Sequence, residues 1–151
     1  MLKSIVATLG NALVKRGISR PHAFQKAWRM ARQSKFFAKA VAVTFGSRQE
    51  ALKRLAQYGR ELVRVYLVHE GNNPVDPSAV AVFVAVADKG QYKAGYLPKE
   101  GADLLARVLD KFGGKLAATL ESITGGGERR YGLNFSYTLG GGWSRPVMKG
   151  V

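Results

Sequence analysis

Residues able to do acid–base, nucleophilic or metal chemistry are sparse in this sequence. Its 151 residues include no cysteine and two histidines, His22 and His69, too few for a closed zinc site of four Cys or His ligands. Asp103 and Asp110 lie two helical turns apart without a base or nucleophile near them. The glycine run 125–127 lacks the Lys-Ser/Thr ending of a phosphate-binding loop and indicates a hairpin turn. The sequence therefore predicts no catalytic residue, metal site, cofactor or small-molecule substrate.

Positive charge is the more informative feature. Twenty-four Lys and Arg against 10 Asp and Glu give a formal net charge of +14. The first acidic residue is Glu50, whereas residues 1–49 contain ten Lys and Arg. This excess favours a polyanion, either a phosphate backbone or anionic lipid. No apolar run approaches the roughly 18 to 20 residues of a membrane-spanning helix, so an integral membrane protein is not expected, and the absence of cysteine is compatible with a reducing compartment.

Hydrophobic periodicity predicts a basic helical hairpin over residues 1–38. A first helix is expected over residues 2–16, with Gly17 as its stop. A second begins near Ser19 and tolerates Pro21 in its first turn. Its apolar stripe is expected to contain Phe24, Ala27, Trp28 and Ala31.

A change of period then predicts a mainly β (α+β) domain over residues 39–139. Strands are expected at 39–46, 61–70, 79–88, 93–97, 115–123 and 131–139, with interposed helices at 47–59 and 99–112. Short strands with one or two helices in about 100 residues indicate a small antiparallel barrel or a strongly curled sheet. Residues 140–151 have few apolar groups and are expected to form a flexible tail.

Three sequence blocks within residues 42–109 resemble a known family. FGSRQEALKRL at 45–55 leads to NPVDPSAVAV at 73–82, and GYLPK at 95–99 precedes an Ala/Leu-rich helix. In this order and spacing they resemble the HIRAN domain, and the Arg-Gln pair at 48–49 is similar to bacterial and phage versions. The resemblance implies a six-stranded barrel related to oligonucleotide-binding (OB) folds that grips the 3′ end of single-stranded DNA, in a cytoplasmic protein encoded by a bacterium or phage.

The resemblance also implies roles for individual residues. Phe45 matches the aromatic that stacks on the terminal base, and Lys99 matches a lysine that neutralises a phosphate. Asp76 would accept the hydrogen bond of the terminal 3′ hydroxyl, while Asn73 would fix the loop or reach the sugar. Tyr96 stands where eukaryotic relatives have a histidine.

Two positions depart from the family pattern. Val75 stands where eukaryotic relatives have a second stacking aromatic, and Thr44 stands where they have a phosphate-binding arginine. Stacking contributes roughly 1–3 kcal/mol per base, so end binding is expected to be about ten-fold or more weaker without that platform. Arg48 is the candidate to restore the phosphate contact.

The same residues also have structural alternatives. Asn73 and Asp76 are suited to shaping a turn by bonding their own backbone. Phe45 at a strand end is equally typical of a core residue, and Arg48 of a surface arginine that caps the strand.

The sequence therefore predicts a non-enzymatic, single-stranded DNA-binding module that recognises 3′ ends, with the basic hairpin adding backbone contacts. Such a module would act with a protein partner that supplies enzymatic activity, or by protecting or marking DNA ends. The alternative is a protein-interaction adaptor that keeps the fold, has lost end recognition and docks through Phe24 and Trp28. A third interpretation takes residues 1–40 as a membrane-surface helix or a cleaved presequence, although Gly17 and Pro21 favour a folded hairpin.

Overall fold

The computed structural model describes residues 2–86 and 89–140, so the expected tail lies outside the described residues from 141 onward. Within the described part, four α-helices and one 3-10 turn accompany a six-stranded antiparallel sheet. This confirms the mainly β, α+β class. In chain order the elements are α1 (Leu2–Lys15), α2 (Arg20–Arg32), β1 (Phe36–Lys39), α3 (Arg48–Leu55), η1 (Arg60–Leu62), β2 (Val63–His69), β3 (Val80–Val86), β4 (Gln91–Tyr96), α4 (Lys99–Lys111), β5 (Lys115–Gly126) and β6 (Arg129–Tyr137).

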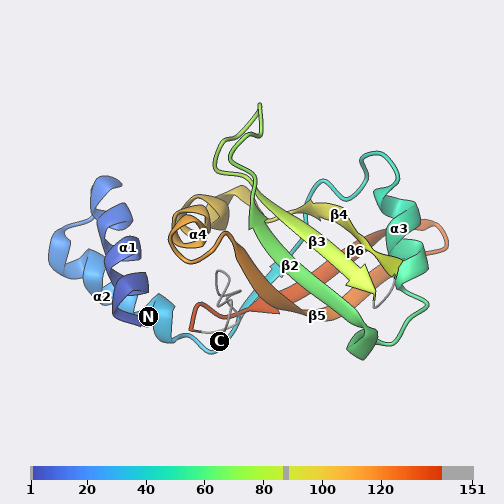
Figure 1. Cartoon of the computed structure of the whole chain (residues 1–151), viewed down its shortest axis with the longest axis horizontal. Coiled ribbons are helices and arrows are strands. Elements are labelled where there is room, and N and C mark those ends of the chain that lie inside the picture. Colours follow the sequence, from blue (N-terminus) through green and yellow to red (C-terminus); the bar gives the residue numbers. More distant parts are fainter. Residues whose placement is uncertain (1, 87–88, 141–151) are drawn as a thin grey trace, which may run out of the picture.

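Helices α1 and α2 form the expected hairpin at one end of the molecule (Figure 1). Gly17, with φ +94°, follows the end of α1, and Ser19 precedes α2. The Ser19 hydroxyl bonds the His22 ring at 2.8 Å instead of capping the backbone. The helices approach closely because Gly10 leaves room for the Phe24 ring, which would lie 2.7 Å from a Cβ at that position.

The expected apolar stripe of α2 is only partly buried. Ala23, Ala27 and Ala31 are the buried side chains of this helix, whereas Phe24 and Trp28 are half-buried. Small residues lie at the α1 contact because they let the two helix backbones come close. The Phe24 ring packs over Gly10, and each aromatic ring has an arginine beside it, Arg20 over Phe24 and Arg32 over Trp28.

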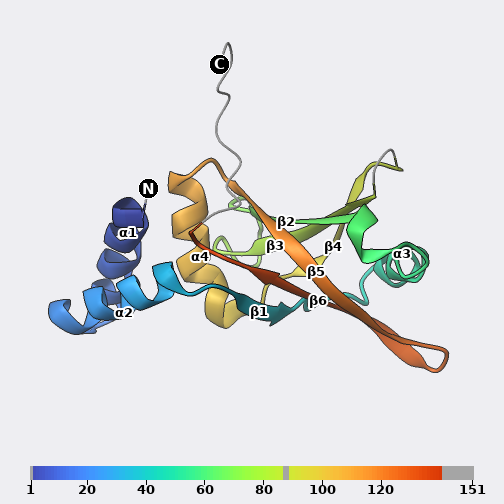
Figure 2. The same ribbon diagram turned by 90° about the horizontal axis from the view of Figure 1, so that it is seen from below.

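The sheet has the strand order β1-β6-β5-β2-β3-β4 and curls into a nearly closed barrel (Figure 2). The two sheet edges meet at one point. Ala40 donates a 2.9 Å hydrogen bond to Leu133 of β6, and the next residue, Val41, exchanges two hydrogen bonds of 2.8 and 2.9 Å with Tyr96 of β4. The segment after β1 therefore passes from one edge of the sheet to the other and closes the barrel.

The first expected strand is displaced in the structure. Residues 39–46 are predicted as extended, but β1 spans Phe36–Lys39, and beyond it only Ala40 and Val41 make backbone hydrogen bonds to neighbouring strands. Ala42 has φ +59°, outside the β region. The register is decided by β6, where Phe36 pairs with Tyr137 and their rings stack at 5.3 Å. The predicted boundary between residues 38 and 39 consequently falls inside β1.

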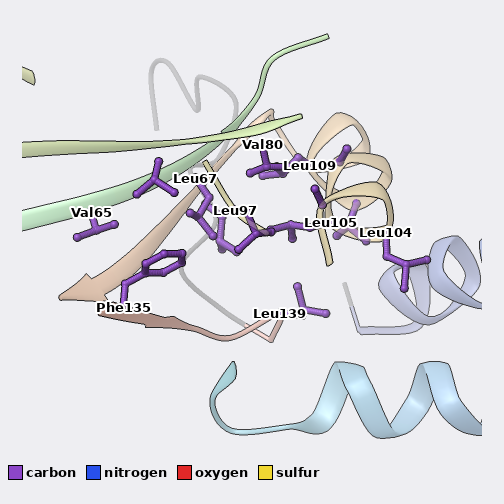
Figure 3. Close-up of a cluster of buried hydrophobic side chains, with 14 of the residues drawn as sticks. Val65, Leu67, Val80, Leu97, Leu104, Leu105, Leu109, Phe135 and Leu139 are labelled. Carbon is purple, nitrogen blue, oxygen red and sulfur yellow. The ribbon is translucent and has the colours of Figure 1, made fainter. Parts of the chain in front are cut away.

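Helix α4 plugs one end of the barrel. Its buried leucines, Leu104, Leu105 and Leu109, belong to one cluster with buried strand residues such as Leu67 and Phe135, and Leu104 lies on the side that faces α1 (Figure 3). Helix α1 packs against the other side of α4, and Arg16, just after α1, forms an ion pair of 2.7 Å with Asp103 of α4. Barrel, α4 and hairpin therefore share one core.

The remaining elements keep the expected order with shifted ends. Helix α3 is shorter than the expected 47–59. Strands β5 and β6 extend to Gly126 and from Arg129, so the expected glycine-rich loop is a tight turn. Its glycines 125–127 all have positive φ, which favours glycine. No helix in the described part of the chain is long and apolar enough to cross a membrane.

Candidate nucleic-acid interface

The six residues singled out from the sequence line one open groove of about 480 Å³. Three segments contribute its walls: the barrel-closing segment and the start of α3, the loop between β2 and β3, and the end of β4 with the first turn of α4. In Figure 1 the β2–β3 loop projects above the sheet. The lining residues are Val41, Ala42, Phe45, Arg48, Asn73, Val75, Asp76, Ala79, Tyr96, Leu97, Lys99 and Ala102.

The bridge between Val41 and Tyr96 lies in the wall of this groove. A glycine allows the two segments to approach each other. A Cβ at Gly95 would lie 2.5 Å from the Val41 carbonyl oxygen, closer than non-bonded atoms come. Barrel closure and groove shape therefore depend on the same small residue.

The Arg-Gln pair at the start of α3 holds the closing segment in place. Arg48 Nη1 donates a 2.6 Å hydrogen bond to the Ala42 carbonyl, the residue with positive φ. The Gln49 amide donates to the Val43 and Tyr131 carbonyls and accepts from the Tyr131 N–H at 2.7 Å. Gln49 thus ties the loop to β6.

Arg48 also contacts aromatic rings. Its guanidinium carbon lies 5.8 Å from the Phe45 centroid and 5.4 Å from the Tyr96 centroid, within the range of cation–π attraction. Phe45 is 64% exposed, so it is not a core residue in this structure. Val75, on the opposing loop, is 91% exposed. The groove therefore has an apolar rim and a cationic side chain among its aromatics.

The Asn73 side chain is committed to the loop. Its Oδ1 accepts from the backbone N–H groups of Val75 and Asp76 at 2.9 and 3.0 Å. Its Nδ2 donates to Glu70 Oε1 at 2.9 Å. Asn73 therefore shapes the β2–β3 turn, the first of the two roles expected for it.

Only one carboxylate oxygen of Asp76 makes a hydrogen bond within the described residues. Oδ1 accepts from the Ser78 N–H at 2.9 Å, while Oδ2 has no hydrogen-bond partner within residues 2–86 and 89–140. Lys99, in the first turn of α4, is exposed and has no ion-pair partner in the same ranges. A cation here is opposed by the helix dipole, so its position in α4 does not itself stabilise the helix.

A polar cluster beneath the loop was not predicted from the sequence. Glu70 accepts from the Tyr96 hydroxyl at 2.6 Å and from Lys93 at 2.5 Å. Burial opposes ionisation of Glu70, but hydrogen bonds from Lys93, Tyr96 and Asn73 outweigh it and hold the pKa of this carboxyl below its ordinary value. The hydrogen bond to Glu70 raises the pKa of Lys93. This charged, hydrogen-bonded cluster joins β4 to the β2–β3 loop from below.

His69 anchors the other side of the loop. Its Nδ1 lies 2.6 Å from Asp110 Oδ1 on α4, and its Nε2 lies 2.7 Å from the Pro77 carbonyl oxygen. Both partners are acceptors, so an imidazole that makes both hydrogen bonds is protonated on both nitrogens. Although burial acts to lower it, the contacts with Asp110 and Pro77 raise the pKa of His69.

No signal in a single sequence links Glu70, Lys93 and His69 to their partners, because these contacts join strands and helices far apart along the chain. Glu70 offers the one hint, as an acid beside a turn in a basic chain. Within the described residues, no group of three His, Cys, Asp or Glu side chains is arranged to hold a metal ion.

Comparison with family models matches residues 34–139 to the HIRAN domain. The match covers well over half of the chain, runs through all six strands, α3 and α4, and excludes the α1–α2 hairpin. Neither the curated proteins nor the solved structures yield a match.

Proposed function

The chain belongs to the HIRAN domain family, whose domains bind DNA, and from that premise we propose that its groove binds the 3′ end of single-stranded DNA without catalysing a reaction. The six lining residues named above are the proposed contacts. A module of this kind acts with a protein partner that supplies enzymatic activity, or protects the ends it holds.

The observation that supports end recognition is the Asp76 carboxylate in the groove. A carboxylate repels the phosphates of a DNA strand that lies across it. In the DNA-binding groove of a protein of net charge +14, a carboxylate is therefore expected only where the DNA offers it a hydrogen-bond donor. A terminal 3′ hydroxyl is such a donor. Oδ2 is available for that hydrogen bond because Oδ1 already bonds Ser78.

The rest of the groove suits the last nucleotide of a strand. Phe45 presents an exposed ring on which a base can stack. Arg48 and Lys99 supply positive charge for the adjoining phosphates. Val75 adds an apolar contact but no second aromatic face, so we expect weaker binding than a two-sided sandwich provides.

The test compares strands that end in a 3′ hydroxyl with the same strands ending in a 3′ phosphate. A terminal phosphate brings like charge to Asp76, and the lost charge-assisted hydrogen bond is expected to cost about 1–3 kcal/mol, or roughly ten-fold in affinity. Asp76→Asn retains Oδ1 for Ser78 and removes the negative charge. It should therefore reduce the preference for strands with a 3′ hydroxyl over strands with a 3′ phosphate. Lys99→Ala should weaken both strands about equally.

Glu128→Gln is the matched control, because it removes one exposed negative charge at the β5–β6 turn, outside the groove. Equal affinity of the wild type for both ends would exclude end recognition. Salt-insensitive or absent binding of all oligonucleotides would instead favour the adaptor function, in which the half-buried Phe24 and Trp28 of the hairpin dock on a protein.

A further inference from the structure

One stripe of helix α2 is a second concentration of groups suited to phosphate. Gln25, Trp28, Arg29 and Arg32 follow the spacing i, i+3, i+4 and i+7, which places them on one helix face. Together with Gln33 they line an open concavity of about 770 Å³. We call these five residues the α2 stripe. It lies outside the HIRAN match, which begins at residue 34.

The positive charge here is not compensated within the protein. Neither α1 nor α2 contains an acidic residue, and within the described ranges Arg29 and Arg32 have no acidic partner. Other basic side chains do have one, as Arg16 has Asp103. The positive charge on this face is therefore free to interact with an external anion.

The apolar faces of the hairpin are already covered. The alanines of α2 are buried against α1, and Ile5, Leu9 and Leu13 of α1 are buried in the common core with α4. An amphipathic helix that binds a membrane inserts an exposed apolar face among the lipids. The described part of this hairpin has no exposed apolar face, so its positive charge favours binding to nucleic acid over binding to an anionic membrane.

We propose that the α2 stripe binds the phosphate backbone of double-helical DNA. The helix packs mainly against α1, which leaves its outer face open (Figure 2). Thirteen residues make a rigid rod about 20 Å long, and the major groove of DNA, about 12 Å wide, admits such a rod. Arginine forks match phosphate oxygens, and glutamine amides add neutral hydrogen bonds.

Trp28 provides a local probe of this site. Its indole is half-buried beneath Arg32, whose guanidinium carbon lies 4.6 Å from the ring centroid. A phosphate that draws Arg32 away changes the environment of the ring. The chain has two tryptophans, so replacing Trp143 by Phe leaves Trp28 as the single reporter.

The test uses a dumbbell duplex, a double helix closed by a loop at each end and therefore without any 3′ terminus. The Trp143→Phe protein should bind it with a change in the Trp28 fluorescence. Arg29→Ala/Arg32→Ala should weaken binding at least ten-fold. It should also make the dependence of log K on log salt shallower by about 1.8, since each phosphate contact on duplex DNA contributes about 0.9.

Arg129→Ala/Arg130→Ala is the matched control. It removes two exposed arginines at the turn between β5 and β6, at the opposite end of the molecule from the hairpin (Figure 2). It should change affinity less than three-fold. An equal loss in both variants would mean that net charge alone drives binding and would overturn the proposal.

Two further outcomes would also overturn it: no binding of the dumbbell, or binding of phosphatidylserine vesicles in its place. Because the dumbbell has no 3′ end, the end recognition proposed for the barrel groove plays no part in its binding. The comparison of hydroxyl-ended and phosphate-ended single strands tests that groove alone, so either proposal can fail without the other.

Discussion

The guanidinium carbon of Arg48 lies 5.4 Å from the centroid of the Tyr96 ring. Arg48 begins helix α3 and Tyr96 ends strand β4, and the two edges of the sheet meet beside Tyr96 where Val41 bonds to it. Arg48 also bonds the Ala42 carbonyl and approaches the Phe45 ring. One side chain therefore orders the closing loop and supports both aromatic residues of the groove.

Arg48→Lys should weaken single-stranded DNA binding about five-fold. Lysine keeps the charge but not the planar fork that bonds Ala42 and lies over the rings, a difference of about 1 kcal/mol. Fluorescence anisotropy with a labelled oligonucleotide measures the change. Arg54→Lys on α3 is the control, because Arg54 is exposed and does not line the groove. Equal effects would show that the Arg48 geometry is not used.

Salt should weaken single-stranded binding steeply. Each phosphate contact contributes about −0.7 to the slope of log K against log salt on single strands. If three or more Lys or Arg side chains contact phosphates, the slope should be about −2 or steeper. A titration series at several salt concentrations measures it, and a flat response would argue against phosphate binding.

Gly95→Ala should destabilise the barrel by about 1–3 kcal/mol, the usual cost of overpacking. The added methyl group would meet the Val41 carbonyl oxygen at 2.5 Å, a backbone atom that cannot turn away. Gly101→Ala is the matched control. Its nearest neighbour would be Leu97 at 3.9 Å, and alanine in the α4 helix should stabilise by about 0.5–1 kcal/mol. Urea unfolding of both variants distinguishes them, and similar curves would contradict the packing argument.

The His69 contacts should stabilise the fold more in acid than in alkali. The folded protein raises the pKa of His69 above its ordinary value of about 6.5. Its stabilisation is therefore complete below about pH 6.5 and is lost as the pH rises through the raised value. His69→Gln should accordingly lower the free energy of unfolding more at about pH 6 than at about pH 9. A difference between variant and wild type that does not change with pH would show that the imidazolium is not the stabilising form.

Removing residues 1–33 should leave a folded but less stable barrel, since the cut keeps β1 and the segment matched to the family. Stability falls because α4 loses its contact with α1. Removing residues 1–39 should cost about 1–2 kcal/mol more, through the Phe36–Tyr137 stack and the β1 hydrogen bonds. Circular dichroism and thermal melts compare the two. An unfolded 34–151 fragment would show that the hairpin is an obligatory part of the domain.

The sequence predicted best what depends on local chemistry. Asn73 and Asp76 bond backbone groups within three residues of themselves, and the glycines at 125–127 need little context to make a turn. The groove residues also carry the family resemblance, so their common location was foreseeable.

Long-range contacts were not predictable in the same way. The strand expected at 39–46 was wrong because β6 and β4, more than fifty residues away, pair with residues 36–41 and leave the next ones to turn. The partners of Glu70 and His69 lie 26 and 41 residues further along. The half-burial of Phe24 and Trp28 follows from Gly10 and the alanines at the helix contact, which periodicity alone does not reveal.

The bridge between Val41 and Tyr96 has a mechanical consequence. It is a seam of two hydrogen bonds, with Phe45 on the segment to one side and the Asp76 loop on the other. A DNA 3′ end that contacts both Phe45 and Asp76 would link the two sides of this seam and resist its opening. Tension on the held strand would pull on the same seam, so release of the end and opening of the barrel would be coupled events.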